Sequence, residues 1–139
     1  MKAGQVFFDP DFTYHDGEKG EKLFVILNDG QDGSYLAVLT TSRQHNKQGT
    51  AGCHVTEYPP NFHFPAGTSF PDNTWLILNS IYEFDCYPLM QKYRMGQIKA
   101  KSLIPNEDVI AVLHCILEDN DDISDNHEER LKVFRDSLL

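Results

Sequence analysis

The sequence predicts a mainly β domain, a small and strongly bent β-sheet or barrel of about five to six strands with one or two α-helices after it. Three observations predict this class. Short apolar runs rich in β-forming residues alternate with turn signals over the first two-thirds of the chain. Four prolines between residues 59 and 71 exclude a long helix there. Apolar residues at helical spacing become clear only after residue 105.

The first half of the chain predicts a strand, a loop and a hairpin. Residues 4–12 alternate weakly and predict a strand that Pro10 stops. The loop around 13–21 has two glycines and mixed charge, which is typical of a mobile segment. LFVILN at 23–28 predicts a strand buried on both faces, and YLAVLTTS at 35–42 predicts its neighbour. The glycine turn between them predicts an antiparallel hairpin.

The second half predicts short strands and then helices. Residues 43–72 are irregular apart from one short strand. Short strands are predicted within 53–58, at 75–78, at 81–84 and within 95–104.

A helix is predicted from Asn106, with acidic residues in its first turn. Ser124 can cap a second, weaker helix. We therefore divide the chain into a barrel domain with its C-terminal helix, residues 1–118, and an acidic link with an amphipathic helical tail, residues 119–139.

Charge and composition bound the function. The net charge of the chain is −9. Residues 106–139 carry ten acidic and three basic side chains, a net charge of −7, so residues 1–105 have a net charge of only −2. RNA binding by this nearly neutral body is therefore physically possible. No apolar run has the length of a membrane span, and the N-terminus lacks a signal-peptide core, so we expect a cytoplasmic protein without membrane contact.

The cysteines and histidines indicate no metal or cofactor. Cys53, Cys86 and Cys115 are odd in number and widely spaced, which predicts buried free thiols and no disulfide framework. Cys53, His54 and His63 could supply three ligands, but no fourth is evident. Nucleotide-binding glycine loops and hydrolase motifs are also absent from the sequence.

One rim of the predicted hairpin gathers groups that suit a phosphate. Lys22 begins one strand, and Thr40 and Thr41 end the next, so an antiparallel pairing sets them side by side. A cation and a hydroxyl can stabilise the charge that develops on a phosphate in a transition state. His15, in the loop, suits proton transfer. Arg43, just past the second strand, suits phosphate binding.

The ordered motifs GQVFF, FTYHDGEKGEKLFVILN, YLAVLTTS, NTWLILNSIYEFD and MGQI, followed by an apolar helix, resemble the PemK/MazF family of toxin endoribonucleases. The resemblance covers about residues 4–117. It implies an SH3-like β-barrel with a C-terminal helix, a homodimer and an antitoxin partner. It also implies cleavage of single-stranded RNA without metal, through attack of the ribose 2′-hydroxyl that leaves a cyclic phosphate.

The resemblance also assigns site residues. The family arginine matches Lys22, which loses the planar fork of arginine, and the family L-T-S motif matches Leu39, Thr40 and Thr41. Lys22, Thr40 and Thr41 are therefore the predicted catalytic residues. The predicted substrate-binding residues are His15, Lys19, Ser42, Arg43, Thr74 and Asn79; among them, Thr74 matches the serine of the family's D-S strand and Asn79 matches that strand's acidic end.

Two alternatives stay open. The chain can be a catalytically degenerate barrel that binds a protein partner, as an antitoxin-binding or gyrase-poison-like module would. It can also be a structural dimer whose acidic tail competes with RNA. For the tail we favour a solvated amphipathic helix packed on the barrel or on a dimer mate.

Overall fold

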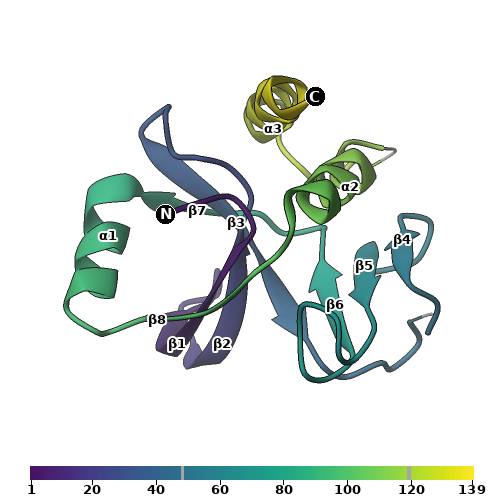
Figure 1. Ribbon diagram of the computed structural model, residues 1–139, viewed down its shortest axis with the longest axis horizontal. Coiled ribbons are helices and arrows are strands. Elements are labelled where there is room, and N and C mark those ends of the chain that lie inside the picture. Colours follow the sequence, from purple (N-terminus) through teal and green to yellow (C-terminus); the bar gives the residue numbers. More distant parts are fainter. Residues whose placement is uncertain (48, 119) are drawn as a thin grey trace.

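The computed structural model describes residues 1–47, 49–118 and 120–139, which form a mixed β/α fold (Figure 1). The strands are β1 (Gln5–Thr13), β2 (Lys19–Ile26), β3 (Ser34–Thr41), β4 (Gly52–His54), β5 (Asn61–Phe64), β6 (Thr74–Ile77), β7 (Tyr82–Asp85) and β8 (Lys99–Leu103). The helices are α1 (Cys86–Arg94), α2 (Asn106–Leu117) and α3 (Asp125–Leu138).

All the strands belong to one antiparallel sheet in the order β4-β5-β6-β3-β2-β1-β8, with β7 paired to β3. The long strand β3 connects the two halves of the sheet. It pairs with β2 through residues 37–39, with β7 through residues 34–37 and with β6 through Thr40 and Thr41. Figure 1 shows β1, β2 and β8 on one side of β3, and β4, β5 and β6 on the other.

The sheet does not close into the predicted SH3-like barrel. In the described part of the chain, the end strands β4 and β8 do not pair with each other, and the sheet stays open. The reason lies in β3, whose last two residues leave β2 and pair with β6, so the sheet splits instead of curling onto itself. The mainly β character and the two C-terminal helices are confirmed.

The number of strands was predicted too low because three local signals misled. Pro10 does not end β1 but sits where the β1–β2 register shifts between Asp9 and Phe12, a place that tolerates a residue without an N–H. β2 begins at Lys19, so the connecting loop is shorter than predicted. The proline-rich segment holds β5 in addition to the expected β4.

Helix α1 was not predicted. Its segment contains Pro88, which the first turn of a helix tolerates. Leu89 is its one buried residue, so the segment carries no apolar periodicity from which a helix could be inferred.

The central strands are buried on both faces, as predicted for LFVILN. Phe24 and Ile26 belong to an aromatic-rich cluster on the face near α1, whereas Val25 and Leu27 belong to the larger cluster beneath α2 and α3. Successive side chains of a strand point to opposite faces, so one continuous apolar run serves both clusters.

The prediction that all three cysteines are free thiols was wrong. Cys53 of β4 and Cys115 of α2 form a disulfide, and only Cys86 is a free thiol. The two partners are 62 residues apart in the sequence, so no spacing motif announces the bond. Over the described residues, no helix is long and apolar enough to cross a membrane.

Candidate functional site

The structure brings the start of β2 and the end of β3 together. Phe24 lies opposite Leu39 in the β2–β3 register, and the Thr40 hydroxyl donates a hydrogen bond of 3.3 Å to the Leu23 carbonyl. Beyond this pair, the Arg43 charge lies near enough to the Lys22 amine to lower the Lys22 pKa, and the Arg43 backbone N–H donates to the Thr41 hydroxyl. We call Lys22, Thr41 and Arg43 the β2–β3 rim.

The two threonines differ in what their hydroxyls can do. Thr40 is buried and gives its hydroxyl hydrogen to the backbone. Thr41 is half-buried, and its hydroxyl oxygen accepts a 3.1 Å hydrogen bond from the Arg43 backbone N–H. The Thr41 hydroxyl therefore keeps its own hydrogen available for a ligand, whereas Thr40 acts in holding the two strands together.

Lys22 and Arg43 form a pair of neighbouring cations. The Lys22 pKa is lowered from its usual value, first by burial of the amine and second by the positive charge of Arg43. Across the described residues, no carboxylate lies within ion-pair distance of either side chain. Asp9 lies opposite Lys22 in the β1–β2 register, but its carboxylate faces Lys92 at 3.9 Å.

The predicted substrate-binding residues of the β1–β2 turn lie apart from this cation pair. Lys19 is exposed and faces the Asp11 carboxylate at 3.5 Å. The His15 ring stacks on the Tyr82 ring with centroids 3.7 Å apart, and the His15 backbone N–H donates to the Tyr82 hydroxyl. The turn is therefore anchored to β7 through His15.

No hydrogen bond joins Ser42, Thr74 or Asn79 to Lys22 among the described residues. Ser42 is exposed directly after β3. Thr74 is buried at the start of β6, and its hydroxyl donates to the Asp72 carbonyl. Asn79 is half-buried beyond the end of β6. Of the predicted residues, the structure thus joins Lys22, Thr40, Thr41 and Arg43.

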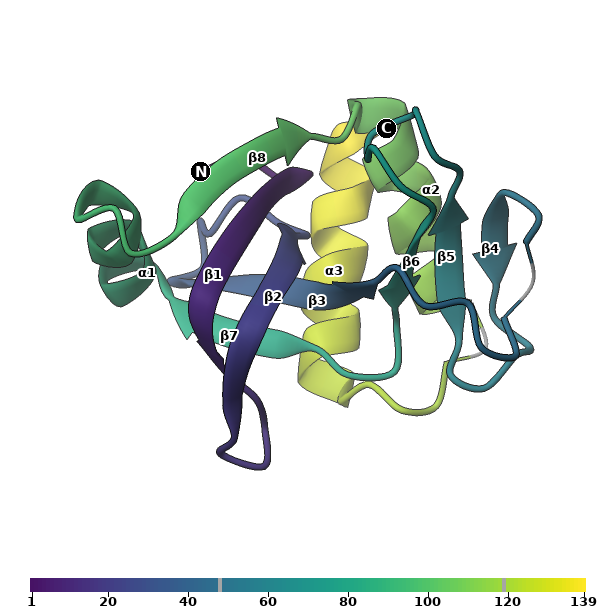
Figure 2. The ribbon, with the colours of Figure 1, turned by 90° about the horizontal axis from the view of Figure 1, so that it is seen from below.

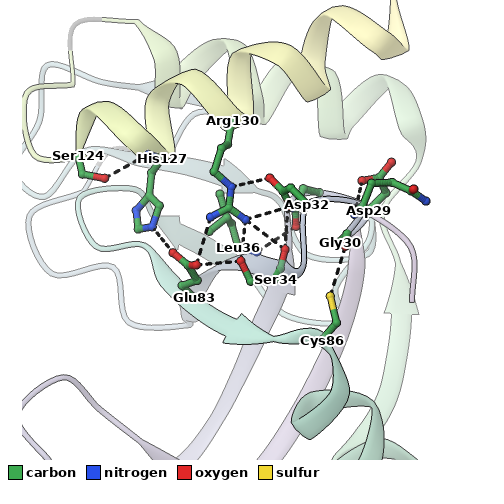
Figure 3. Close-up of polar contacts among 12 residues, drawn as sticks. Asp29, Gly30, Asp32, Ser34, Leu36, Glu83, Cys86, Ser124, His127 and Arg130 are labelled. Atoms are coloured by element: carbon green, nitrogen blue, oxygen red, sulfur yellow. Dashed lines mark hydrogen bonds and ion pairs between the residues drawn. The ribbon is translucent and has the colours of Figure 1, made fainter.

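A second polar cluster was not predicted, and it joins α3 to the sheet (Figure 3). Arg130 donates to both carboxylate oxygens of Asp32 and, at 2.7 Å, to the Ser34 hydroxyl. Glu83 accepts a hydrogen bond of 2.8 Å from Ser34 and lies 2.8 Å from His127. These five residues come from three distant parts of the sequence, so no local motif reveals them.

Hydrogen bonds keep both carboxylates of this second cluster in their charged form. Hydrogen bonds from His127 and Ser34 lower the Glu83 pKa to about 2, and the hydrogen bond and positive charge of Arg130 contribute to the same shift. The hydrogen bond from Arg130 lowers the pKa of Asp32. Ser34 and His127 both contact Glu83 rather than each other, so the cluster lacks the hydroxyl–imidazole contact of a nucleophile and its base. Its role is to dock α3.

The structure offers no metal site in the parts of the chain it describes. Cys53, one of the three ligands considered, is taken up by the disulfide. His54 and His63 both place a ring nitrogen near the Thr50 carbonyl oxygen, at 2.7 and 3.0 Å. These histidines hold the segment before β4 in place.

Comparison with known proteins adds no relative. No protein-family model, no curated protein and no solved structure matches the chain. The functional argument therefore depends on the geometry and charge of the chain's own residues.

Proposed function

We propose that the protein is a toxin-like endoribonuclease that cleaves single-stranded RNA without metal, with the β2–β3 rim as its phosphate-binding site. One observation carries the proposal: Lys22 and Arg43 are neighbouring cations with no carboxylate partner among the described residues. Two like charges held together destabilise the empty site, and a bound phosphate relieves their repulsion.

The proposed reaction is an internal transesterification. The ribose 2′-oxygen attacks the adjacent phosphorus, and the 2′-O–P bond forms as the P–O5′ bond breaks. The 2′-hydroxyl proton passes to a base, and the leaving 5′-oxygen gains a proton. The products are a 2′,3′-cyclic phosphate and a 5′-hydroxyl. The phosphoryl oxygens gain negative charge in the transition state, where cations and hydroxyl donors stabilise them.

Each rim residue has a role in this scheme. The guanidinium of Arg43 grips the phosphate with two parallel donors, which supplies the planar fork that a lysine at position 22 lacks. Lys22, whose pKa is lowered, releases a proton more readily than Arg43 and therefore gives the proton to the leaving oxygen. Thr41 donates its hydroxyl hydrogen to a phosphoryl oxygen.

The β1–β2 turn suits the neighbouring part of an RNA strand. The exposed His15 ring already lies flat on Tyr82, and aromatic or imidazole faces of this kind stack on unpaired bases. Lys19 adds an exposed cation on the same hairpin. The resemblance to the PemK/MazF family supports the same activity, and its homodimer and antitoxin partner stay predictions.

The test is incubation of the purified protein with a long single-stranded RNA in excess EDTA. We expect discrete fragments with cyclic phosphate ends from the wild type, and their loss in Lys22→Ala and Arg43→Ala. Lys132→Ala is the control, because Lys132 is exposed on α3 and forms no ion pair in the described structure. Intact RNA with the wild type, or equal cleavage by all variants, would contradict the proposal.

A further inference from the structure

A second surface has the opposite charge to the rest of the chain. Residues 86–105, which span α1 and β8, contain four basic and no acidic side chains, in a chain of net charge −9. The four are Lys92, Arg94, Lys99 and Lys101. Only Lys92 forms an ion pair among the described residues, with Asp9. Arg94, Lys99 and Lys101 have no carboxylate within ion-pair distance in the described structure, and the Lys101 amine lies over the Phe8 ring, 5.8 Å from its centroid.

The same segment exposes large apolar side chains. Tyr87, Tyr93, Met95 and Leu103 are 44 to 70% exposed. Single exposed apolar residues are ordinary, but four within eighteen residues of sequence form a local concentration. We call the exposed side chains of α1 and β8, with Met1 and Lys2 beside them, the α1–β8 face.

This face is hollowed on both sides of Leu103. A pocket of about 490 Å³ is lined by Met1, Met90, Tyr93 and Leu103 together with the cations Lys2 and Arg94. A second pocket of about 500 Å³ shares Met1, Lys2 and Leu103 with it, also has Asp29 in its lining, and continues toward α2 and α3, so this pocket suits an apolar side chain and not a carboxylate. Both are mainly apolar, which suits aliphatic side chains of a ligand.

The strand between these pockets has a free edge. β8 ends the strand order and pairs only with β1 in the described structure, so its outer backbone N–H and C=O groups have no strand partner. Figure 2 shows β8 along the outer edge of the sheet with α1 at its start. An extended peptide can add to such an edge through main-chain hydrogen bonds and place alternate side chains in neighbouring pockets.

We infer that the α1–β8 face binds an extended acidic segment of a partner protein, which adds to β8 as a further strand. Its acidic side chains meet Lys99 and Lys101, which lie on the Phe8 side of the sheet. Its alternate, apolar side chains point to the other side and fill the pockets around Leu103, which lies opposite Gln5. A second copy of β8 is a poor occupant, because Lys99 and Lys101 of two copies would repel each other. The apolar lining and the open strand edge favour a peptide over a nucleic acid.

The experiment selects binders from a library of random displayed peptides against the full chain, and measures the affinity of one synthetic selected peptide. We expect enriched peptides with acidic residues alternating with apolar ones, weaker binding at high salt, and amide NMR shifts on β8. Lys99→Glu should weaken binding roughly tenfold, and Lys132→Glu, which changes the charge equally on α3, by less than about twofold.

The pocket is tested separately by Leu103→Ser against the control Val133→Ser, since both side chains are more than half exposed and both changes replace a branched aliphatic side chain with serine. Circular dichroism verifies that each variant is folded, and Lys101→Glu replaces Lys99→Glu if the latter is not. Three results would overturn the inference: no enriched peptide, enriched peptides without acidic excess, or binding that survives Lys99→Glu and Leu103→Ser. Single-stranded RNA that binds the wild type and not Lys99→Glu would assign the face to nucleic acid instead.

Discussion

The guanidinium of Arg43 lies near enough to the Lys22 amine to lower the Lys22 pKa, although Arg43 follows β3 and Lys22 belongs to β2. The β2–β3 pairing brings the two cations together, and no described carboxylate separates them. Holding like charges together has a free-energy cost, which an anionic ligand removes. This relationship is the physical basis of the proposed phosphate site.

The Lys22 pKa provides a direct test of that relationship. Arg43→Gln removes the second cause of the depression and leaves burial, so the Lys22 pKa should rise toward its usual value. An NMR titration of the lysine side-chain carbons checks this. Lys19, exposed on the same strand, is the internal reference. If the Lys22 pKa is the same in Arg43→Gln as in the wild type, the Arg43 charge does not act on Lys22 and the paired-cation site is contradicted.

The docking of α3 should weaken in acid. The folded state lowers the Glu83 pKa from 4.5 to about 2, so its carboxylate stabilises the fold fully above about pH 4.5. This contribution is lost as the pH falls from 4.5 through 2, because Glu83 binds a proton in the unfolded state over this range and stays ionised in the folded state, which favours unfolding. Thermal unfolding across this range should show a steeper pH dependence for the wild type than for Glu83→Gln.

Glu128→Gln is the control for this pH experiment, since Glu128 is exposed on α3 and forms no ion pair in the described structure. It should keep the wild-type pH dependence. Equal curves for the wild type and Glu83→Gln would mean that the contacts of Glu83 with His127 and Ser34 do not contribute to stability.

Arg130 should be the most important polar residue of α3. Its side chain is only 17% exposed and binds Asp32, Ser34 and Glu83. Arg130→Met keeps the apolar stem and removes these bonds, so the free energy of unfolding should fall by roughly 1–2 kcal/mol. Urea denaturation measures the change. Lys132→Met, on the exposed face of the same helix, should stay within about 0.5 kcal/mol of the wild type, and equal losses would refute the docking role.

The disulfide should stabilise the pairing of β4 with α2. Cys53 and Cys115 are 62 residues apart, and the entropy of a loop of that length corresponds to about 4 kcal/mol of stabilisation. Cys53→Ser/Cys115→Ser should therefore melt well below the wild type, whereas Cys86→Ser, which removes the free thiol, should change little. Mass spectrometry after alkylation without reductant should find one alkylated cysteine; three would contradict the bond.

The sequence predicted correctly those elements whose stabilising contacts lie between residues close together in the chain. The run at 23–27 is apolar throughout and contributes to both apolar clusters, and Ser124 accepts the capping hydrogen bond from His127 at the start of α3. The approach of the start of β2 to the end of β3, where the Thr40 hydroxyl bonds the Leu23 carbonyl, followed from antiparallel pairing. In each case the deciding interaction lies within a hairpin or a single turn.

What the sequence could not predict depends on distant contacts. The sheet is open because the end of β3 pairs with β6 and no longer with β2. No residue within β3 indicates this change of partner. Helix α1 buries only Leu89, so it has no periodic pattern. The contact of Arg130 with Asp32 spans 98 positions, and the Cys53–Cys115 bond spans 62. Such pairs become visible only once the chain is folded.

The measurement that tests the central claim most directly is the salt dependence of single-stranded RNA affinity for the wild type, Lys22→Gln, Arg43→Gln and the control Lys132→Gln. If the β2–β3 rim binds phosphate, each rim variant should bind about tenfold more weakly. Each should also lower the slope of log affinity against log salt by roughly 0.7, the value for one lost contact to a single strand. Lys132→Gln should keep both the affinity and the slope. Unchanged affinity and slope in both rim variants would contradict the account.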